Sequence, residues 1–348
     1  MDNEEPKKTI SWLKKRKRLL IGLATLVLMV VLVFIVDFPL FISKIIIIGF
    51  WGLTLFIITY TIAFLLRAYK LKLIFEGLNQ PIKFSTSYFS IGAGFLINEL
   101  TPGKVGDIVK IFIIRDQEDV KLSESVAGIA IERVLDLIFL FFISCFALFY
   151  LYLNNLGEVN DLIILGQNIQ FYLILGAILI VLILTFFLLL LYKTELILSI
   201  IKRISSKLSF YLEKFLNNFK EGIKRFTDQK IKLIYITLLS FPMWIIDALV
   251  VVIFFYLLDY TFNIFLLILA TMLLFFSKTF PITPGGWGIS ENIGALFLFI
   301  FYPLIPFTEI LSIFIIDHLF RSVYLFLYGG YSVFHYNINL KKSKELIL

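Results

Sequence analysis

Charged side chains stand inside one of the most apolar stretches of the sequence. Glu132, Arg133 and Asp136 lie in a run that continues to Leu153. On a helix these positions are three and four residues apart, so their side chains approach one another. Each such charge costs roughly 2.5–3.5 kcal/mol near mid-bilayer, and such residues usually face a bundle interior and mark a pathway. Because a guanidinium donates two parallel hydrogen bonds, Arg133 held by its acidic neighbours is a candidate contact for a lipid phosphate.

A second group of charges repeats this pattern near the end of the chain. Arg321 follows Asp317 by one helical turn, and His318 stands beside them. We expect Arg321 to be the second phosphate contact and His318 to be a hydrogen-bonded core residue rather than a proton relay. Asp247 and Lys278 also interrupt apolar runs, and we expect them to pair with each other. The alternative for both groups is that the charges neutralise one another and only pack the bundle.

The pattern Thr-Pro-Gly-x-x-Gly occurs twice, beginning at Thr101 and at Thr283. Proline and glycine break a helix there, and each break follows an apolar segment shorter than the about 20 residues that a span needs. Asp136 lies 35 residues after Thr101, and Asp317 lies 34 residues after Thr283. A half-helix that begins after such a break offers free backbone N–H groups to an anion.

The two breaks belong to segments of opposite direction. Loop lysines and arginines indicate that span 41–66 runs inward and that span 233–258 runs outward. We therefore predict inverted repeats at about 41–153 and 233–335, with their broken segments meeting near the midplane at a transport site. The alternative is two ordinary kinked helices.

The composition excludes a soluble protein. Of 348 residues 60% are hydrophobic and only 16% are charged, whereas a soluble domain has roughly 45–50% apolar and roughly 25% charged residues. The sequence predicts an all-α, polytopic membrane helix bundle in the cell membrane, with both termini cytoplasmic. Its predicted parts are a basic cytoplasmic tail (1–18), a first transmembrane span (19–36), repeat one (37–153, re-entrant segment 84–115), an outside loop and return span (154–192), a basic amphipathic cytoplasmic linker (193–232), repeat two (233–335, re-entrant segment 264–303) and a cytoplasmic tail (336–348).

Motifs of metal, nucleotide and hydrolase sites are missing from the sequence. It has one cysteine, Cys145, two histidines, no Gly-x-x-x-x-Gly-Lys-Ser/Thr loop and no Gly-x-Ser-x-Gly elbow. We therefore expect no metal, no cofactor, no catalytic residue and no nucleic-acid partner. The linker at 193–232 is typical either of a positively charged inner loop or of a surface that recognises anionic lipid.

Several motifs resemble the flippase-like transmembrane region of lysylphosphatidylglycerol synthases. The similar segments, in order, are Arg67-Ala68-Tyr69-Lys70, Asn98 to Asp107, Glu132 to Asp136, Pro284 to Glu291, and Arg321. This chain departs from the family pattern in having Asp107 where Glu is usual and Lys110 where Arg is common. The 348 residues do not include the aminoacyl-transferase domain of the full synthases, so the resemblance implies lipid translocation rather than lysine transfer. The residues assigned to the substrate path are Arg67, Asn98, Thr101, Pro102, Gly103, Gly106, Asp107, Glu132, Arg133, Asp136, Thr283, Pro284, Gly285, Gly286, Gly288, Glu291, Asp317 and Arg321.

Three functions are compatible with the sequence. The favoured one is a flippase for an anionic or head-group-modified lipid, such as an aminoacyl phosphatidylglycerol or a polyprenyl-phosphate-linked sugar, with a separate lipid synthase or glycosyltransferase as a partner. The second is a membrane-embedded lipid-modifying transferase or its subunit, with Glu132 or Asp136 as the base. The third is a secondary carrier for an ion or a small solute. The sequence leaves the lipid, the energy source and the oligomeric state open.

Overall fold

The structure, a computed structural model, describes residues 38–153, 163–164, 167–168, 185, 206–278 and 283–336. These residues are helical apart from turns and one short antiparallel β pair, β1 (Ile163–Ile164) with β2 (Gln167–Asn168). The predicted all-α architecture is therefore confirmed. The predicted tails, the first span and most of the 154–192 segment lie outside the described residues.

The two halves of the chain contain helices in the same order of long, short, short, long. The first half has α2 (Phe38–Gly77), α3 (Phe84–Leu100), α4 (Val105–Glu118) and α5 (Leu122–Leu153), and the second has α9 (Lys230–Leu257), α10 (Ile264–Ser277), α11 (Ser290–Phe301) and α12 (Phe307–His335). In each half the Thr-Pro-Gly break separates the two short helices, and in the second it includes a single 3-10 turn, η2 (Pro284–Gly286). The repeated order agrees with a duplicated unit.

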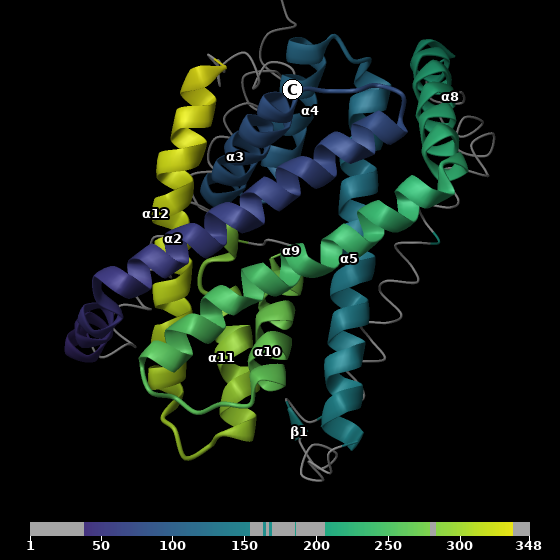
Figure 1. Ribbon diagram of the computed structural model, residues 1–348. Helices are drawn as coiled ribbons and strands as arrows, with labels where there is room; N and C mark the ends of the chain where they lie inside the picture. The colour runs from purple at the N-terminus through teal and green to yellow at the C-terminus, as the bar shows by residue number, and fades with distance from the viewer. Residues whose placement is uncertain are drawn as a thin grey trace, which may run out of the picture.

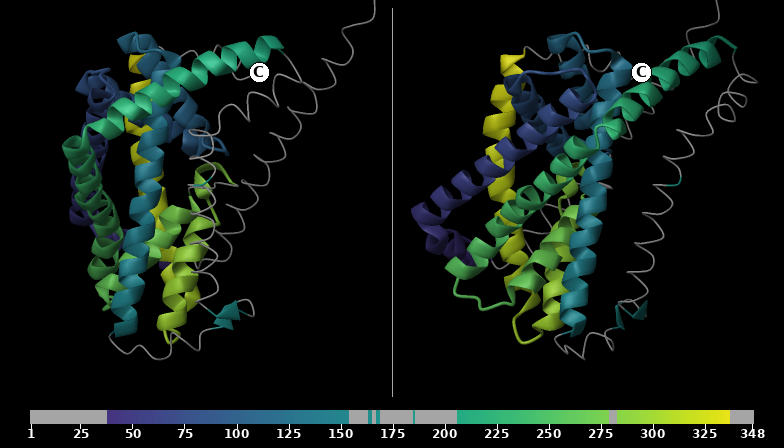
Figure 2. Two further views of the ribbon diagram at one scale, coloured as in Figure 1. Left: turned by 90° about the vertical axis from the view of Figure 1, so that its right-hand side faces the viewer. Right: turned by 45° about the vertical axis from the view of Figure 1, so that its right-hand side comes forward.

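The short helices of the two halves lie toward opposite ends of the molecule (Figure 1). α2 and α9 pack side by side and cross its middle, while α5 and α12 run along its length (Figures 1 and 2). Short pairs at opposite ends are what an inverted repeat requires. The inversion itself, and the entry of the short pairs from opposite faces of a membrane, stay predictions.

Three of the described helices are long and apolar enough to cross a membrane: Pro39–Gly77, Lys230–Leu257 and Phe307–His335. Their outer surfaces carry large exposed apolar side chains, among them Trp51 at 76% and Phe334 at 79% exposure. Large contiguous apolar surface of this kind is rare on water-facing proteins and marks contact with a membrane or a partner.

α2 does not end where the sequence predicts. We expected a basic loop after residue 66, with Arg67 and Lys70 at a span end, but the helix continues to Gly77. Arg67 is 6% exposed and Lys70 is 1% exposed. Their charges are compensated by Asp247 and Asp136, respectively, which no local pattern indicates. The prediction of a loop there was therefore wrong.

α3 and α4 form a tight hairpin because glycines let their backbones meet. A Cβ atom added at Gly106 would lie 1.8 Å from the carbonyl oxygen of Gly94. The Gly106 N–H also donates to Asn98 Oδ1 at 2.8 Å. The second glycine of the first break is thus required by packing, since any side chain would force the helices apart.

The basic linker is described only from its later part, α8 (Ser206–Asp228). Phe219 and Phe226 are buried while Lys224 is exposed, so this helix is amphipathic as expected. Arg225 Nη2 donates to Glu124 Oε1 at 2.6 Å and attaches α8 to the start of α5. Its place on the cytoplasmic side stays a prediction.

Candidate functional site

A cavity of about 330 Å³ with charged and apolar lining lies where the two halves meet. Residues that line it come from α2, α3, α4, α5, α9, α10 and α12 and from both breaks. The cavity therefore brings together residues that are far apart in the sequence. Phe95, Leu137, Leu140, Trp244, Phe275 and Leu325 supply apolar wall. The charged lining comprises the cations Arg67, Lys104, Arg133, Lys278 and Arg321, and the carboxylates Glu99, Asp107, Asp136 and Asp247; Tyr60 and His318 line the cavity as well.

Asp247 on α9 holds two arginines. It accepts hydrogen bonds from Arg67 of α2 and from Nη1 of Arg321 on α12. Arg321 Nη2 donates to the Asp247 carbonyl oxygen at 2.9 Å, and Arg321 Nε lies 2.8 Å from both carboxylate oxygens of Asp317. The expected Asp317–Arg321 pair is confirmed, whereas the expected Asp247–Lys278 pair was wrong. Every guanidinium nitrogen of Arg321 is already engaged.

Arg67 is the less satisfied member of this cluster. Its Nη1 is buried and has no hydrogen-bond partner among the side chains and backbone that the structure describes. Its guanidinium lies 5.2 Å from the ring centroid of Trp244 and 5.6 Å from that of Phe95, at cation–π distance. Arg67 therefore lines the cavity with its Nη1 group free to donate, as far as the described residues show.

The charged residues of α5 pair with other helices more than with one another. Glu132 accepts from Lys110 Nζ at 2.6 Å, and both side chains are buried. Arg133 Nη2 donates to Asp107 Oδ1 at 2.8 Å, and Lys110 Nζ lies 3.3 Å from the same oxygen. These four residues join α4 to α5. The alternative of a triad that neutralises itself within α5 does not describe Glu132 and Arg133.

Asp136 completes the ion pairing on the other side of α5. It accepts from Lys70 Nζ of α2 at 2.7 Å, and Arg133 Nη1 is farther away, 3.7 Å from its other oxygen. The four long helices are thus linked by buried ion pairs, α5 to α2, α2 to α9, and α9 to α12.

Two backbone N–H groups of the breaks, one in each half, are not free for an anion. Gly106 N–H is taken by Asn98 Oδ1, and Gly288 N–H donates to Glu291 Oε2 at 2.7 Å. Each break thus receives a side-chain acceptor from a neighbouring short helix, and the expected amide cradle was wrong at these two glycines. The reason is that a buried N–H must find a partner, and here the protein supplies its own.

Two lysines of the cavity wall have no partner within the part of the chain that the structure describes. Lys104 stands inside the first break and Lys278 follows α10 just before the second. Neither Nζ makes a hydrogen bond or an ion pair within 4.0 Å to any described residue, in contrast to Lys70 and Lys110. The stem of Lys278 passes Gly286, where an added Cβ would lie 3.0 Å from Lys278 Cγ. The positive charge that lacks a partner among the described residues therefore comes from Lys104 in the first break and from Lys278 just before the second.

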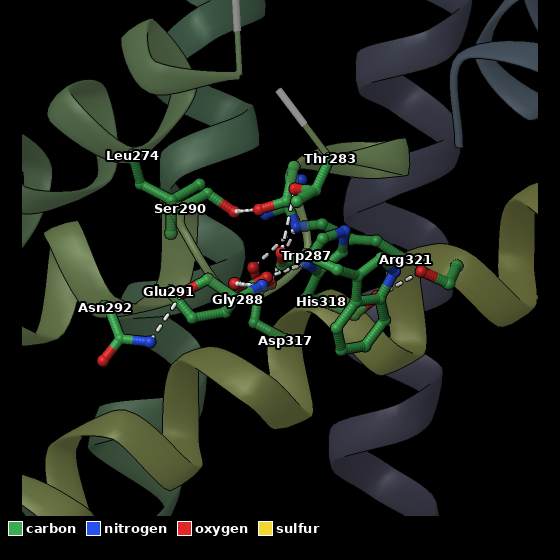
Figure 3. Close-up of polar contacts among 12 residues, drawn as sticks. Leu274, Thr283, Trp287, Gly288, Ser290, Glu291, Asn292, Asp317, His318 and Arg321 are labelled. Atoms are coloured by element: carbon green, nitrogen blue, oxygen red, sulfur yellow. Dashed lines mark hydrogen bonds and ion pairs between the residues drawn. The ribbon is translucent and has the colours of Figure 1, made fainter. Parts of the chain in front are cut away.

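A second polar group crosses from the first half to the second around His318. Its Nδ1 is hydrogen-bonded to Glu291 Oε1, and its Nε2 lies 3.3 Å from Glu99 Oε1 of α3. Glu99 Oε1 also accepts from Trp287 Nε1 at 2.8 Å and from Ser322 Oγ. The indole of Trp287 is stacked on the imidazole, with centroids 4.0 Å apart and planes at 9° (Figure 3).

Positive φ explains one more glycine of the second break. Gly285 has φ +63°, and a Cβ there would meet the Glu99 carboxylate at 2.7–2.9 Å. The glycine therefore lets a carboxylate of the first half approach the backbone of the second.

The predicted site residues fall into three groups. The cavity wall includes seven of them: Arg67, Asn98, Asp107, Arg133, Asp136, Gly285 and Arg321. Those behind the wall, which hold the lining in place, are Gly106, Glu132, Gly286, Gly288, Glu291 and Asp317. The remaining five shape the breaks without lining the cavity: Thr101, Pro102, Gly103, Thr283 and Pro284.

The prediction missed residues that the fold brings to this site. Glu99 and Lys104 stand within the first broken motif, so their position offered a signal. His318, Asp247 and Lys278 were recognised as charges or polar groups in apolar runs but were not assigned to the site. Trp287 carried no signal beyond its place in the second motif.

The chain is similar to known membrane proteins over most of its length. Residues 19–329 match the model of the lysylphosphatidylglycerol synthase TM region. A UPF0104 membrane protein of Methanocaldococcus jannaschii is 27% identical over 255 residues, which cover 72% of this chain and 97% of that protein. No solved structure matches the chain.

Proposed function

Because the chain belongs to the family of the lysylphosphatidylglycerol synthase TM region, we propose that it is a transporter which moves a phosphate-bearing lipid between membrane leaflets. The lipid has an anionic or modified head group, such as an aminoacyl phosphatidylglycerol or a polyprenyl-phosphate-linked sugar. A separate lipid synthase or glycosyltransferase would supply it. The observation that carries this proposal is that Lys104 and Lys278, in the cavity between the two halves, have no hydrogen-bond or ion-pair partner among the residues that the structure describes.

The size of the cavity suits a head group and not a whole lipid. Its volume of about 330 Å³ is at the lower end of the roughly 300–1,000 Å³ of small-molecule sites. The acyl chains would stay outside, against the exposed apolar surfaces of the long helices. The head group would then cross the membrane among charged side chains and would not enter the hydrocarbon. Transfer of a polar group into hydrocarbon is the main barrier to unassisted crossing.

The choice of lysine over arginine refines the sequence-based hypothesis. Arg133 and Arg321 were expected to bind phosphate, but every guanidinium nitrogen of Arg321 already donates to Asp247 or Asp317, and Arg133 donates to Asp107 and lies near Asp136. A phosphate that took Arg321 would leave the buried Asp317 carboxylate without an ion-pair partner among the described residues, which is costly. Lys104 and Lys278 can bind a phosphate oxygen without that loss, and a charge-assisted hydrogen bond contributes about 1.5–3 kcal/mol.

The test is lipid movement by the purified full chain in phosphatidylcholine vesicles. The probe is phosphatidylglycerol with a fluorescent acyl chain, and dithionite reports the fraction in the outer leaflet. We expect wild-type protein to speed equilibration over empty vesicles. The Lys104→Gln/Lys278→Gln double variant should lose tenfold or more of that rate. Lys83→Gln, which removes an exposed charge outside the cavity, is the matched control and should keep the wild-type rate.

Two results would overturn the proposal. One is a wild-type rate equal to that of empty vesicles with phosphatidylglycerol, lysylphosphatidylglycerol and a polyprenyl phosphate alike. The other is ion or solute flux through the protein with no lipid movement, which would favour the carrier alternative. Chemical turnover of the lipid by the protein alone would favour the transferase.

A further inference from the structure

We propose that His318, together with Glu99 and Glu291, binds the proton that drives lipid movement, so that one proton travels with one phosphate head group. This inference rests on the proposed function and names its energy source. It is carried by the placement of one imidazole between carboxylates from the two halves of the chain.

Hydrogen-bond counting shows that the cluster has room for a proton. A neutral imidazole has one N–H, yet both ring nitrogens of His318 face a carboxylate. Nε2 is buried and makes no hydrogen bond with the described residues, although Glu99 Oε1 is 3.3 Å away. If Nδ1 carries the single N–H toward Glu291, the lone pair of Nε2 faces an oxygen that also has only lone pairs. An added proton turns that repulsion into an ion pair.

The proton would control a contact between the two halves. Glu99 is the last but one residue of α3, while Glu291 and His318 belong to α11 and α12. Protonated His318 attracts Glu99 and draws the first break toward the second. Deprotonated His318 leaves Glu99 with the hydrogen bonds from Trp287 and Ser322 among the described residues. Loading and losing the proton therefore biases two arrangements of the broken segments, which is what a coupled transporter needs.

The charges around His318 link the proton to the phosphate. Glu99 and Glu291 favour an imidazolium, whereas Lys278, which faces it from the end of α10, and Arg321, on its own helix, oppose one. Arg321 is compensated by Asp247 and Asp317, whereas Lys278 has no ion-pair partner among the described residues. A phosphate on Lys278 would cancel that opposition and favour the proton. By linkage the proton strengthens phosphate binding by the same factor.

The stoichiometry balances charge. A phosphodiester head group carries one negative charge and the proton one positive charge, so their joint movement carries no net charge. A pH difference should therefore drive the lipid, and a membrane potential alone should not.

The experiment uses the same vesicles and fluorescent phosphatidylglycerol, with pH 6 outside and pH 7 inside and with potassium and valinomycin holding the potential at zero. At one proton per lipid, the limit is about tenfold enrichment in the inner leaflet per pH unit. We expect wild-type protein to approach it. His318→Gln should lose the enrichment, since an amide does not titrate in this range, and the readout is the leaflet ratio that is reached rather than the rate. His335→Gln, an exposed histidine at the end of α12, is the matched control and should retain the enrichment.

The outcomes distinguish the failure of proton coupling from the failure of lipid movement. Fast wild-type equilibration with equal leaflets at every pH difference would overturn proton coupling and leave lipid movement intact. Enrichment that persists in His318→Gln would overturn the assignment to this residue. Absence of any lipid movement by wild-type protein would overturn both proposals. Should His318→Gln fail to fold, Glu99→Gln serves instead, because its amide oxygen still accepts from Trp287 and Ser322; it too should lose the enrichment.

Discussion

Replacing Asp247 by asparagine should destabilise the folded protein. Asp247 is 3% exposed and is the common partner of Arg67 and Arg321. The cluster of these three residues and Asp317 is neutral, and Asp247→Asn leaves it with one uncompensated positive charge. Arg321 retains Asp317, but Arg67 loses the carboxylate that it contacts among the described side chains.

The expected magnitude follows from that charge. Removing one partner of a buried ion pair costs about 3–5 kcal/mol because the other charge is left without compensation. At about 1.36 kcal/mol per factor of ten, the unfolding equilibrium constant should rise roughly 10²- to 10⁴-fold. The measurement is reversible unfolding of the purified protein in mixed micelles, followed by far-ultraviolet circular dichroism as the denaturing detergent is increased.

A double variant separates charge from packing. Arg67→Met/Asp247→Asn removes one charge of each sign and keeps the Arg321–Asp317 pair, so the cluster is neutral again. We expect it to recover at least half of the stability lost in Asp247→Asn, because replacing a buried pair by groups of similar volume is often neutral. Glu76→Gln breaks a partly exposed pair with Lys72 and is the control, with an expected loss under about 1 kcal/mol.

Two results would refute this reasoning. One is Asp247→Asn unfolding within about 1 kcal/mol of wild type. The other is a double variant whose loss of stability equals the sum of the losses in Arg67→Met and Asp247→Asn. Independent effects would add in this way, whereas the effects of coupled charges would not.

Two further predictions concern packing and attachment. Gly106→Ala should lower stability by about 3 kcal/mol or more because the added carbon meets Gly94 O at 1.8 Å. The control is Gly330→Ala, where no atom lies within 4 Å of the added carbon, and its stability should stay within about 1 kcal/mol of wild type. Equal thermal shifts of the two variants would contradict this prediction. Glu124→Gln should weaken the 2.6 Å pair with Arg225 and raise deuterium exchange in α8 but not in α12, and unchanged exchange in α8 would show that the pair does not hold the helix.

The sequence was most informative where a charged residue stands inside an apolar run. Charges inside apolar runs pointed to Arg133, Asp136, Asp317 and Arg321, and three of these line the cavity. The reason is energetic: a charge in an apolar helix is costly in contact with lipid and almost always faces the bundle interior or a cavity, so its presence alone indicates an interior site.

The partner of each charge could not be predicted in the same way. Local spacing correctly paired Asp317 with Arg321, four residues apart on one helix. It failed for Asp247, whose partners are 180 residues before it and 74 residues after it. Spacing along a helix determines neighbours on that helix, whereas neighbours across helices depend on how the bundle packs.

The sequence by itself determined the membrane class, the repeated Thr-Pro-Gly breaks and the presence of buried charge, because composition and helix-breaking residues act locally. Only the tertiary structure decided which charges are satisfied. It engaged Arg321 fully, occupied the amides of Gly106 and Gly288, and left Lys104 and Lys278 facing the cavity. Compensation of a buried charge depends on distances between helices, and those distances exist only once the two halves have packed together.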